Sequence, residues 1–135
     1  MLYITGIHAL NLPCELETCG DWHQSSIQWA DPHLRESSNT FYKDYGIEKN
    51  HRIPEHEGVF NVANTIRAIL DLLYDKKFSI AQGMNEDYIC NPKYDQEVFM
   101  QVSKMKFLDH WQEIDAFMSR EYRLKWLDYK ENNHV

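Results

Sequence analysis

The pattern of apolar positions divides the chain into two parts, with the change near Gly58. Before this glycine, apolar residues occur in short β-branched or aromatic runs separated by polar segments, which is typical of strands and loops. After it, apolar residues recur every three or four positions, as in helices packed against a core. We therefore expect one α+β domain spanning residues 1–135, with about three helices in 58–135 packed on a small or irregular β-layer in 1–57. A mostly helical domain with an irregular N-terminal arm is the alternative.

The N-terminal part predicts few regular elements. Residues 2–8 are β-branched and aromatic and predict a first strand. Residues 25–29 predict a second short strand, with Ile27 and Trp29 on one face by alternation. Residues 35–58 are polar, and we expect a long ordered loop there with room for one edge strand.

The C-terminal part predicts a helix, an extended return and two further helices. The first helix begins at Asn61, whose side chain can accept a hydrogen bond from a free backbone amide, and ends at the charged residues 75–77. Its buried row is Val62, Ile66, Ile69, Leu70 and Leu73. Residues 78–82 alternate and predict a strand or extended return before Gly83.

Two more helix starts follow. Asn91 and Pro92 predict the start of a helix, because proline at the first helical position loses no needed hydrogen bond. The apolar row of this helix is Val98, Val102 and Met105. Asp109 and Gln112 resemble a capping box and predict the start of the last helix. Its aromatic stripe is Trp111, Ile114, Met118, Tyr122 and Trp126.

Charge and composition limit the class of protein. The net charge is -7, and the basic residues are scattered, which disfavours binding to duplex nucleic acid. Acidity fits a basic protein partner, or simply good solubility. No long apolar run predicts a membrane span or signal peptide. The 3 cysteines are an odd number in a chain that is not a disulfide-dense scaffold, which favours a reducing, cytoplasmic location.

One loop holds ligands that zinc prefers. Cys14, Cys19 and His23 supply two thiols and an imidazole within ten residues. A fourth ligand could come from His8, His33, His51 or His56. The spacing is looser than in structural zinc modules, and a second ligand pair is missing. The alternative is two unligated cysteines packed as small hydrophobic side chains.

The same loop could support acid–base catalysis. Asp21 and His23 are two residues apart, so in an extended segment both point to the same side, near His8. A carboxylate beside an imidazole can orient it as a general base. Cys19, Ser25 and Ser26 are candidate nucleophiles by proximity alone. The alternative is that Asp21 caps a turn and His23 bonds a backbone carbonyl.

Two other polar segments have both functional and structural interpretations. His51 and His56 could anchor a ligand or a metal, although Pro54 between them prevents a regular helix face, which favours a solvated loop. Gly83 could present backbone amides to an anion. The acidic residues that follow it favour an ordinary turn instead.

Four aromatic residues stand in polar surroundings and predict a binding surface. These are Trp22, Trp29, Tyr42 and Tyr45. Exposed indoles and phenols are favoured at protein interfaces, and with the acidic charge they would suit a basic partner. The alternative is that these rings close the N-terminal layer over the helices.

Several short segments resemble a known group of proteins. They are Thr5-Gly-Ile-His8-Ala-Leu, Gly20-Asp-Trp-His23, Val62-Ala-Asn-Thr-Ile-Arg67, Ala81-Gln-Gly-Met-Asn85 and Glu113-Ile-Asp-Ala-Phe-Met118. Together they are similar to small bacterial proteins associated with abortive-infection-type nucleotidyltransferase toxins, in toxin–antitoxin or phage-defence systems. The resemblance implies a neutralising or accessory role and transfers no catalytic residue.

The sequence therefore predicts a non-catalytic, acidic interaction module, antitoxin-like or an accessory of a bacterial defence system, with a basic protein partner. The alternative is a small hydrolase or nucleotide-processing enzyme that uses His8, Asp21 and His23, with or without a metal. A third possibility is a single-strand nucleic-acid binder that stacks bases on its aromatic residues, which the net charge disfavours.

Overall fold

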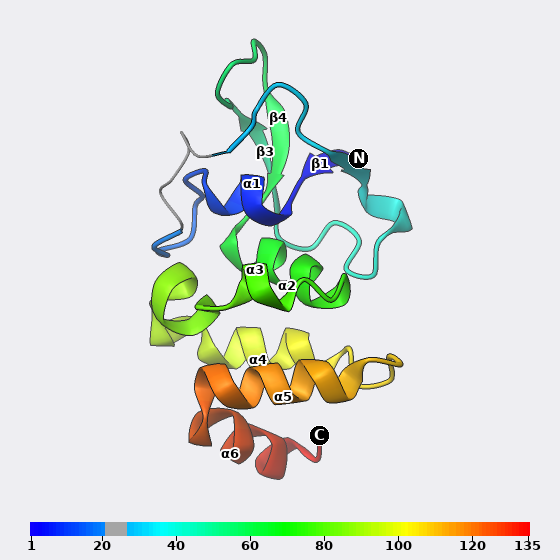
Figure 1. Ribbon diagram of the computed structural model, residues 1–135, viewed down its shortest axis with the longest axis vertical. Helices are drawn as coiled ribbons and strands as arrows, with labels where there is room; N and C mark the ends of the chain where they lie inside the picture. Colours follow the sequence, from blue (N-terminus) through cyan, green and yellow to red (C-terminus); the bar gives the residue numbers. More distant parts are fainter. Residues whose placement is uncertain (21–26) are drawn as a thin grey trace.

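A four-stranded sheet lies at one end of the molecule with α1 beside it, and the helices from α2 to α6 are stacked away from it (Figure 1). The computed structural model describes residues 1–20 and 27–135. In Figure 1, α2 and α3 lie next to the sheet, α4 and α5 lie beyond them, and α6 is farthest away. The expected α+β class is confirmed.

The sheet has the order β2-β1-β4-β3. Its strands are β1 (Leu2–Ile4), β2 (Leu34–Glu36), β3 (Ile47–His51) and β4 (Phe60–Ala63). Strand β1 runs antiparallel to β2 and parallel to β4, and β4 runs antiparallel to β3. The β-layer thus extends past Gly58 into β4, beyond the point where the apolar period changes.

The helices follow the sheet strands along the chain, apart from two short elements. Those two are α1 (Gly6–Leu10) and the 3-10 turn η2 (Ser37–Asn39). The others are α2 (Thr65–Tyr74), α3 (Phe78–Ala81), the π-helix η3 (Met84–Ile89), the 3-10 turn η4 (Pro92–Tyr94), α4 (Asp95–Ser103), α5 (Trp111–Tyr122) and α6 (Leu124–Asn133).

Helix α2 is the centre of the core. Every residue of α2 from 65 to 73 is buried, because the helix contacts β4 and α1 as well as α3, η3 and α4. Asn64 begins the helix, and its Oδ1 accepts the Arg67 N–H at 2.9 Å. A helix buried on all sides belongs to the interior, so polar residues on α2 need partners within the protein.

The first strand is shorter than the sequence predicts. Strand β1 ends at Ile4, and residues 6–10 form α1 because the chain turns at Gly6, where φ is +65°. The strand predicted at 25–29 is also wrong for its described part, since residues 27–29 are not in a strand.

The predicted start of the first long helix is also wrong. Val62 lies in β4, and the helix begins at Asn64 rather than at Asn61. The Asn61 side chain instead donates Nδ2–H to the Leu2 carbonyl at 2.9 Å, which joins β4 to β1. The apolar row ran on through the end of a strand into a helix, so the period alone could not separate them.

Two predictions about the C-terminal half are corrected. Residues 78–81 form the short helix α3 rather than an extended return, and the Ala81 N–H donates to the Lys77 carbonyl at 3.1 Å. The last helix starts at Trp111, with His110 as N-cap and no capping side chain, and it breaks at Arg123 into α5 and α6. The predicted start at Asn91 is confirmed, since its side chain accepts the Lys93 N–H.

The side chain of Arg67 is fully buried in the middle of α2. Its Nε–H donates to Asp71 Oδ1 at 2.9 Å, one turn further along the helix. Its Nη1 donates to the carbonyl oxygens of Lys43 and Tyr45, each at 2.6 Å. Arg67 thereby fixes the segment that leads into β3 against the central helix.

The other end of the guanidinium reaches β1. Arg67 Nη2 donates to Tyr3 Oη at 2.8 Å and to Thr40 Oγ1 at 2.9 Å, so all five N–H donors have acceptors. Asp71 Oδ2 accepts from Tyr3 Oη and from Thr5 Oγ1, each at 2.7 Å. The buried ion pair is therefore fully hydrogen-bonded, which is the condition for a buried charge to be tolerated.

Gly46 allows the close approach that this network needs. Its φ is +70°, and a Cβ there would lie 2.7 Å from Arg67 Cβ. Its carbonyl accepts the Asn64 N–H at 2.8 Å, just before α2 begins. Any larger residue at this position would push the segment away from the guanidinium.

Replacing Arg67 with methionine should lower the free energy of unfolding by about 3–5 kcal/mol, because Asp71 would remain buried without its cation. Urea unfolding of Arg67→Met and of the control Arg52→Met, whose guanidinium is exposed, measures this. A loss below about 1 kcal/mol for Arg67→Met would show that the network does not support the fold.

Buried tyrosines should make the fold sensitive to alkali. Burial, reinforced by Asp71, raises the pKa of Tyr3 to about 12, and burial also raises the pKa of Tyr42, Tyr45 and Tyr122. In the unfolded chain tyrosine ionises near pH ~10. The contribution of these tyrosines to the free energy of unfolding should therefore be constant below pH ~10 and fall as the pH rises toward about 12.

Urea unfolding as a function of pH, together with tyrosinate absorbance, measures this effect. We expect these four tyrosines to ionise only with unfolding. Complete ionisation near pH ~10 without loss of structure would contradict the expected linkage.

Candidate functional site

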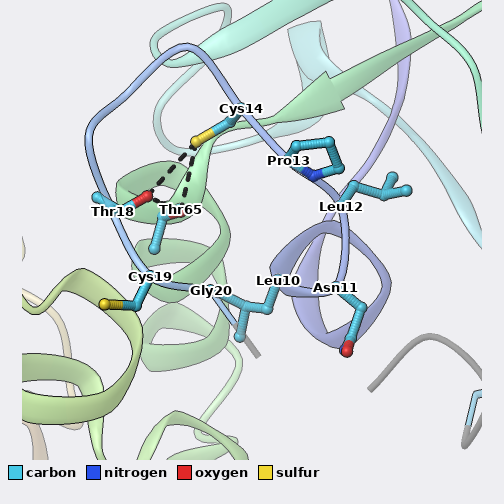
Figure 2. A pocket seen from close by; sticks show the side chains of 9 residues that line it. All are labelled: Leu10, Asn11, Leu12, Pro13, Cys14, Thr18, Cys19, Gly20 and Thr65. Carbon is cyan, nitrogen blue, oxygen red and sulfur yellow. Dashed lines mark hydrogen bonds between the residues drawn. The ribbon is translucent and has the colours of Figure 1, made fainter. Parts of the chain in front are cut away.

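The loop of residues 14–20 encloses a small cavity at the N-terminal end of α2 (Figure 2). The cavity has a volume of about 60 Å³. Its lining residues are Leu10, Asn11, Leu12, Pro13, Cys14, Thr18, Cys19, Gly20 and Thr65. A water molecule would fit in this volume, but an organic substrate would not.

The Cys14 thiol points toward two threonines in this cavity, as Figure 2 shows. Its Sγ lies 3.4 Å from Thr65 Oγ1 and 3.6 Å from Thr18 Oγ1, and the two hydroxyl oxygens are 2.7 Å apart. The thiol is thus part of a closed hydrogen-bonded group at the start of α2.

Cys19 is bonded to Cys90 in a disulfide that spans 71 residues. The backbone N–H groups of Cys19 and Gly20 both donate to the Tyr88 carbonyl, at 3.0 and 2.9 Å. The loop is therefore fastened to the end of η3. The odd cysteine is Cys14, the one free thiol among the described residues.

This pairing changes the interpretation of the predicted zinc ligands. A disulfide sulfur cannot serve as a thiolate ligand, so Cys14 and Cys19 do not form a ligand pair here. Within residues 1–20 and 27–135, no three His, Cys, Asp or Glu side chains are grouped closely enough to hold a metal ion. His23 lies outside the described residues. Disulfides persist mainly in oxidising compartments, and the cytoplasmic location stays a prediction.

Of His8, Asp21 and His23, only His8 lies in the described part of the chain, and the candidate nucleophile Cys19 is held in the disulfide. His8, on α1, donates Nε2–H to the Gln28 carbonyl at 2.8 Å, and its ring meets Trp29 edge-on at 5.0 Å. Asp21 and His23 lie outside the described residues, so their convergence with His8 stays a prediction.

Two of the predicted partner-binding aromatics are in the core. Trp29 is 3% exposed and Tyr42 is 6% exposed, so neither offers an exposed ring to a partner. Tyr42 Oη donates to the Gln101 carbonyl at 2.6 Å, which satisfies the hydroxyl inside the protein. Tyr45 is half-buried and donates to Glu97, and Trp22 lies outside the described residues.

The histidines of residues 51–57 also have partners within the protein. His51 Nε2 lies 2.7 Å from Glu48 Oε1, and His56 donates Nε2–H to the Trp29 carbonyl at 2.6 Å. The two imidazoles bond to different partners, which disfavours further the joint anchor that the sequence left as the less favoured alternative to a solvated loop.

An open groove lies instead between η2 and the C-terminal end of α2. It has a volume of about 290 Å³ and is lined by Arg35, Glu36, Asn39, Thr40, Phe41, Asp71, Tyr74 and Asp75. We call it the Phe41–Tyr74 groove. Its volume is close to the lower limit of sites that hold small molecules or side chains.

Two stacked rings form the apolar side of the Phe41–Tyr74 groove. The ring centroids of Phe41 and Tyr74 are 5.5 Å apart with planes inclined by 29°, and each residue is 39% exposed. Phe41 also meets the buried Tyr42 edge-on at 4.9 Å, which fixes its ring. Rings that are held in place but remain exposed are suited to binding.

The polar side of the groove contains more carboxylates than cations. Asp75 forms an ion pair with Arg35, the one cationic side chain among the described residues that line the groove. Asp71 lies deeper, and its carboxylate is already occupied by Arg67 and Tyr3. Asp75 and Glu36 are both partly exposed, and Glu36 is paired with the N-terminal amine, so Asp75 is the partly exposed carboxylate that lies next to Tyr74 in the sequence.

Sequence reasoning missed both rings of this groove, although a signal was present. Tyr74 falls outside the apolar row of α2, which predicts an exposed side chain at the end of the helix. Phe41 and Tyr42 are adjacent, so one ring had to face outward, but the sequence alone does not show which one.

No protein-family model, no curated protein and no solved structure matches this chain. In residues 1–20 and 27–135, no helix has both the length and the apolar character needed to cross a bilayer.

Removing the disulfide should destabilise the protein by about 4 kcal/mol, because a loop spanning 71 residues would no longer be closed in the unfolded chain. Urea unfolding of the double variant Cys19→Ser/Cys90→Ser measures this loss. The matched control is Cys14→Ser, which should cost less than about 1 kcal/mol. Equal stability of the two variants would contradict the role of the disulfide.

Proposed function

We propose that this protein is an acidic protein-interaction module that binds a basic protein partner at the Phe41–Tyr74 groove. The observation that carries the proposal is the pair of exposed, stacked rings beside the Asp75 carboxylate. A cation placed over an aromatic face and next to a carboxylate gains from both interactions. An arginine side chain of the partner fits this arrangement best.

The net charge of -7 supports the same kind of partner. Long-range attraction raises the rate of encounter with a basic surface, and it weakens with added salt. Within the groove, Arg35 already binds Asp75 from inside the chain, which shows that a guanidinium fits beside this carboxylate.

In the biological setting, we propose an antitoxin-like neutraliser or an accessory protein of a bacterial defence system. This part of the proposal rests on the resemblance of five short sequence segments, and the partner would then be a basic toxin enzyme. The buried positions of Trp29 and Tyr42 move the proposed binding surface to Phe41 and Tyr74.

An acetylated and amidated tri-arginine peptide is a suitable probe of the groove. In NMR titrations with this peptide, we expect the largest shifts in the protein resonances of Phe41, Tyr74 and Asp75. Phe41→Ala should weaken binding about two- to fivefold, because it removes one aromatic face. Asp75→Asn should weaken it at least as much, because it removes the carboxylate.

Two controls separate this site from general electrostatic attraction. Phe107→Ala removes a phenylalanine that is 87% exposed and does not line the groove, and it should leave binding unchanged. The same peptide with citrulline in place of arginine should bind much more weakly. Equal loss in Phe107→Ala and Phe41→Ala, or equal binding of both peptides, would refute the groove as the site.

A further inference from the structure

A second, polar hollow lies between the turn from α3 into η3 and the C-terminal end of α5. Its volume is about 420 Å³, within the usual range for small-molecule sites. It shares no residue with the Phe41–Tyr74 groove. A ligand bound there would be independent of the proposed partner-binding function.

Arg123, at the rim of this hollow, has a strained backbone. Its φ is +54° and its ψ is -126°, a conformation that glycine adopts easily and L-residues rarely adopt. Within the described residues its guanidinium makes no hydrogen bond and no ion pair. The side chain therefore does nothing in the fold that offsets the strain, and strain of this kind is concentrated at functional sites.

The hollow has one basic wall and one acidic wall. Arg120 lies one turn before Arg123 and, in the described part of the chain, also has no ion-pair or hydrogen-bond partner. Glu86 and Asp87 face the hollow from η3, and their carboxylates likewise form no ion pair with described residues. The two walls thus leave opposite charges available on either side of one hollow. A π-helix such as η3 is rare and is often found at functional sites.

Glu121 occupies the backbone amides that could otherwise bind an anion in this hollow. Its two carboxylate oxygens accept the backbone N–H groups of Gly83 and Asn85, each at 3.2 Å. The backbone amides that the sequence suggested for an anion are therefore occupied by the protein's own carboxylate. Gly83 is needed because a Cβ there would lie 2.6 Å from Asp87 Oδ2.

An apolar surface adjoins the polar walls. A neighbouring hollow of about 360 Å³ shares Ser79, Gln82, Arg120 and Glu121 with the first. It adds Phe78 and Phe117, whose ring centroids are 5.6 Å apart. Phe117 is 2% exposed, so the partly buried Phe78 is the ring that an apolar group of a ligand can contact while its charged groups lie between the walls.

We propose that this hollow binds a small zwitterion, a free amino acid with an apolar or aromatic side chain. Its carboxylate pairs with Arg120 and Arg123, which suit a carboxylate because the guanidinium binds it through two parallel hydrogen bonds. Its ammonium group pairs with Glu86 and Asp87, and its side chain contacts Phe78.

Calorimetric titration of the full chain with L-phenylalanine and L-leucine tests the proposal. Two half-ligands separate the walls: 3-phenylpropionate carries only the carboxylate, and 2-phenylethylamine carries only the ammonium. L-phenylalanine should bind about tenfold more tightly than either half-ligand. Arg120→Gln should weaken the binding of L-phenylalanine and 3-phenylpropionate about tenfold and leave the binding of 2-phenylethylamine unchanged. Glu86→Gln should weaken the binding of L-phenylalanine and 2-phenylethylamine and leave that of 3-phenylpropionate unchanged.

Arg123→Gly tests the strain argument separately. We expect it to raise Tm, because glycine relieves the backbone, and to lose L-phenylalanine binding as Arg120→Gln does. A lower Tm in Arg123→Gly would overturn the strain argument. No binding of either amino acid, or equal binding of L-phenylalanine and its half-ligands, would overturn the proposed site.

Discussion

The guanidinium of Arg67 joins the parts of the fold that lie far apart in sequence. It bonds to β1 through Tyr3 and to the segment before β3 through the Lys43 and Tyr45 carbonyls, while Asp71 balances its charge. Because this segment is held by its backbone, Tyr42 points into the core and Phe41 points out. The groove proposed for a partner is therefore a consequence of one buried ion pair.

The class of fold could be predicted because hydrophobic period separates strands from helices over long windows. The boundaries of the individual strands and helices could not be predicted in this way, as α2 shows. Its apolar row continues through Val62 of β4, and two asparagines were available as caps. Asn64 rather than Asn61 is the N-cap of α2 because of tertiary contacts, since the Asn61 side chain donates to the Leu2 carbonyl on the neighbouring strand. Local propensity carries no information about such a partner.

The candidate sites were less predictable than the fold, for three physical reasons. Cysteine pairing depends on spatial proximity, and Cys90 is distant from Cys19 in sequence. Ring exposure depends on orientation, which separates Phe41 from its neighbour Tyr42. Backbone strain is invisible in a sequence, so Arg123 looked like one more basic residue of a long helix. The acidic net charge follows directly from the sequence, and it still supports a basic protein partner.

The parallel pairing of β1 with β4 has a consequence for synthesis on the ribosome. Ile4 pairs with Val62, so β1, one of the two inner strands of the sheet, has no partner on that side until residue 62 has emerged. At about 5–20 residues per second, β1 waits roughly 3–12 s while its apolar side chains are unprotected. The early chain must therefore rely on β2, or on a chaperone, to remain unaggregated until the sheet closes.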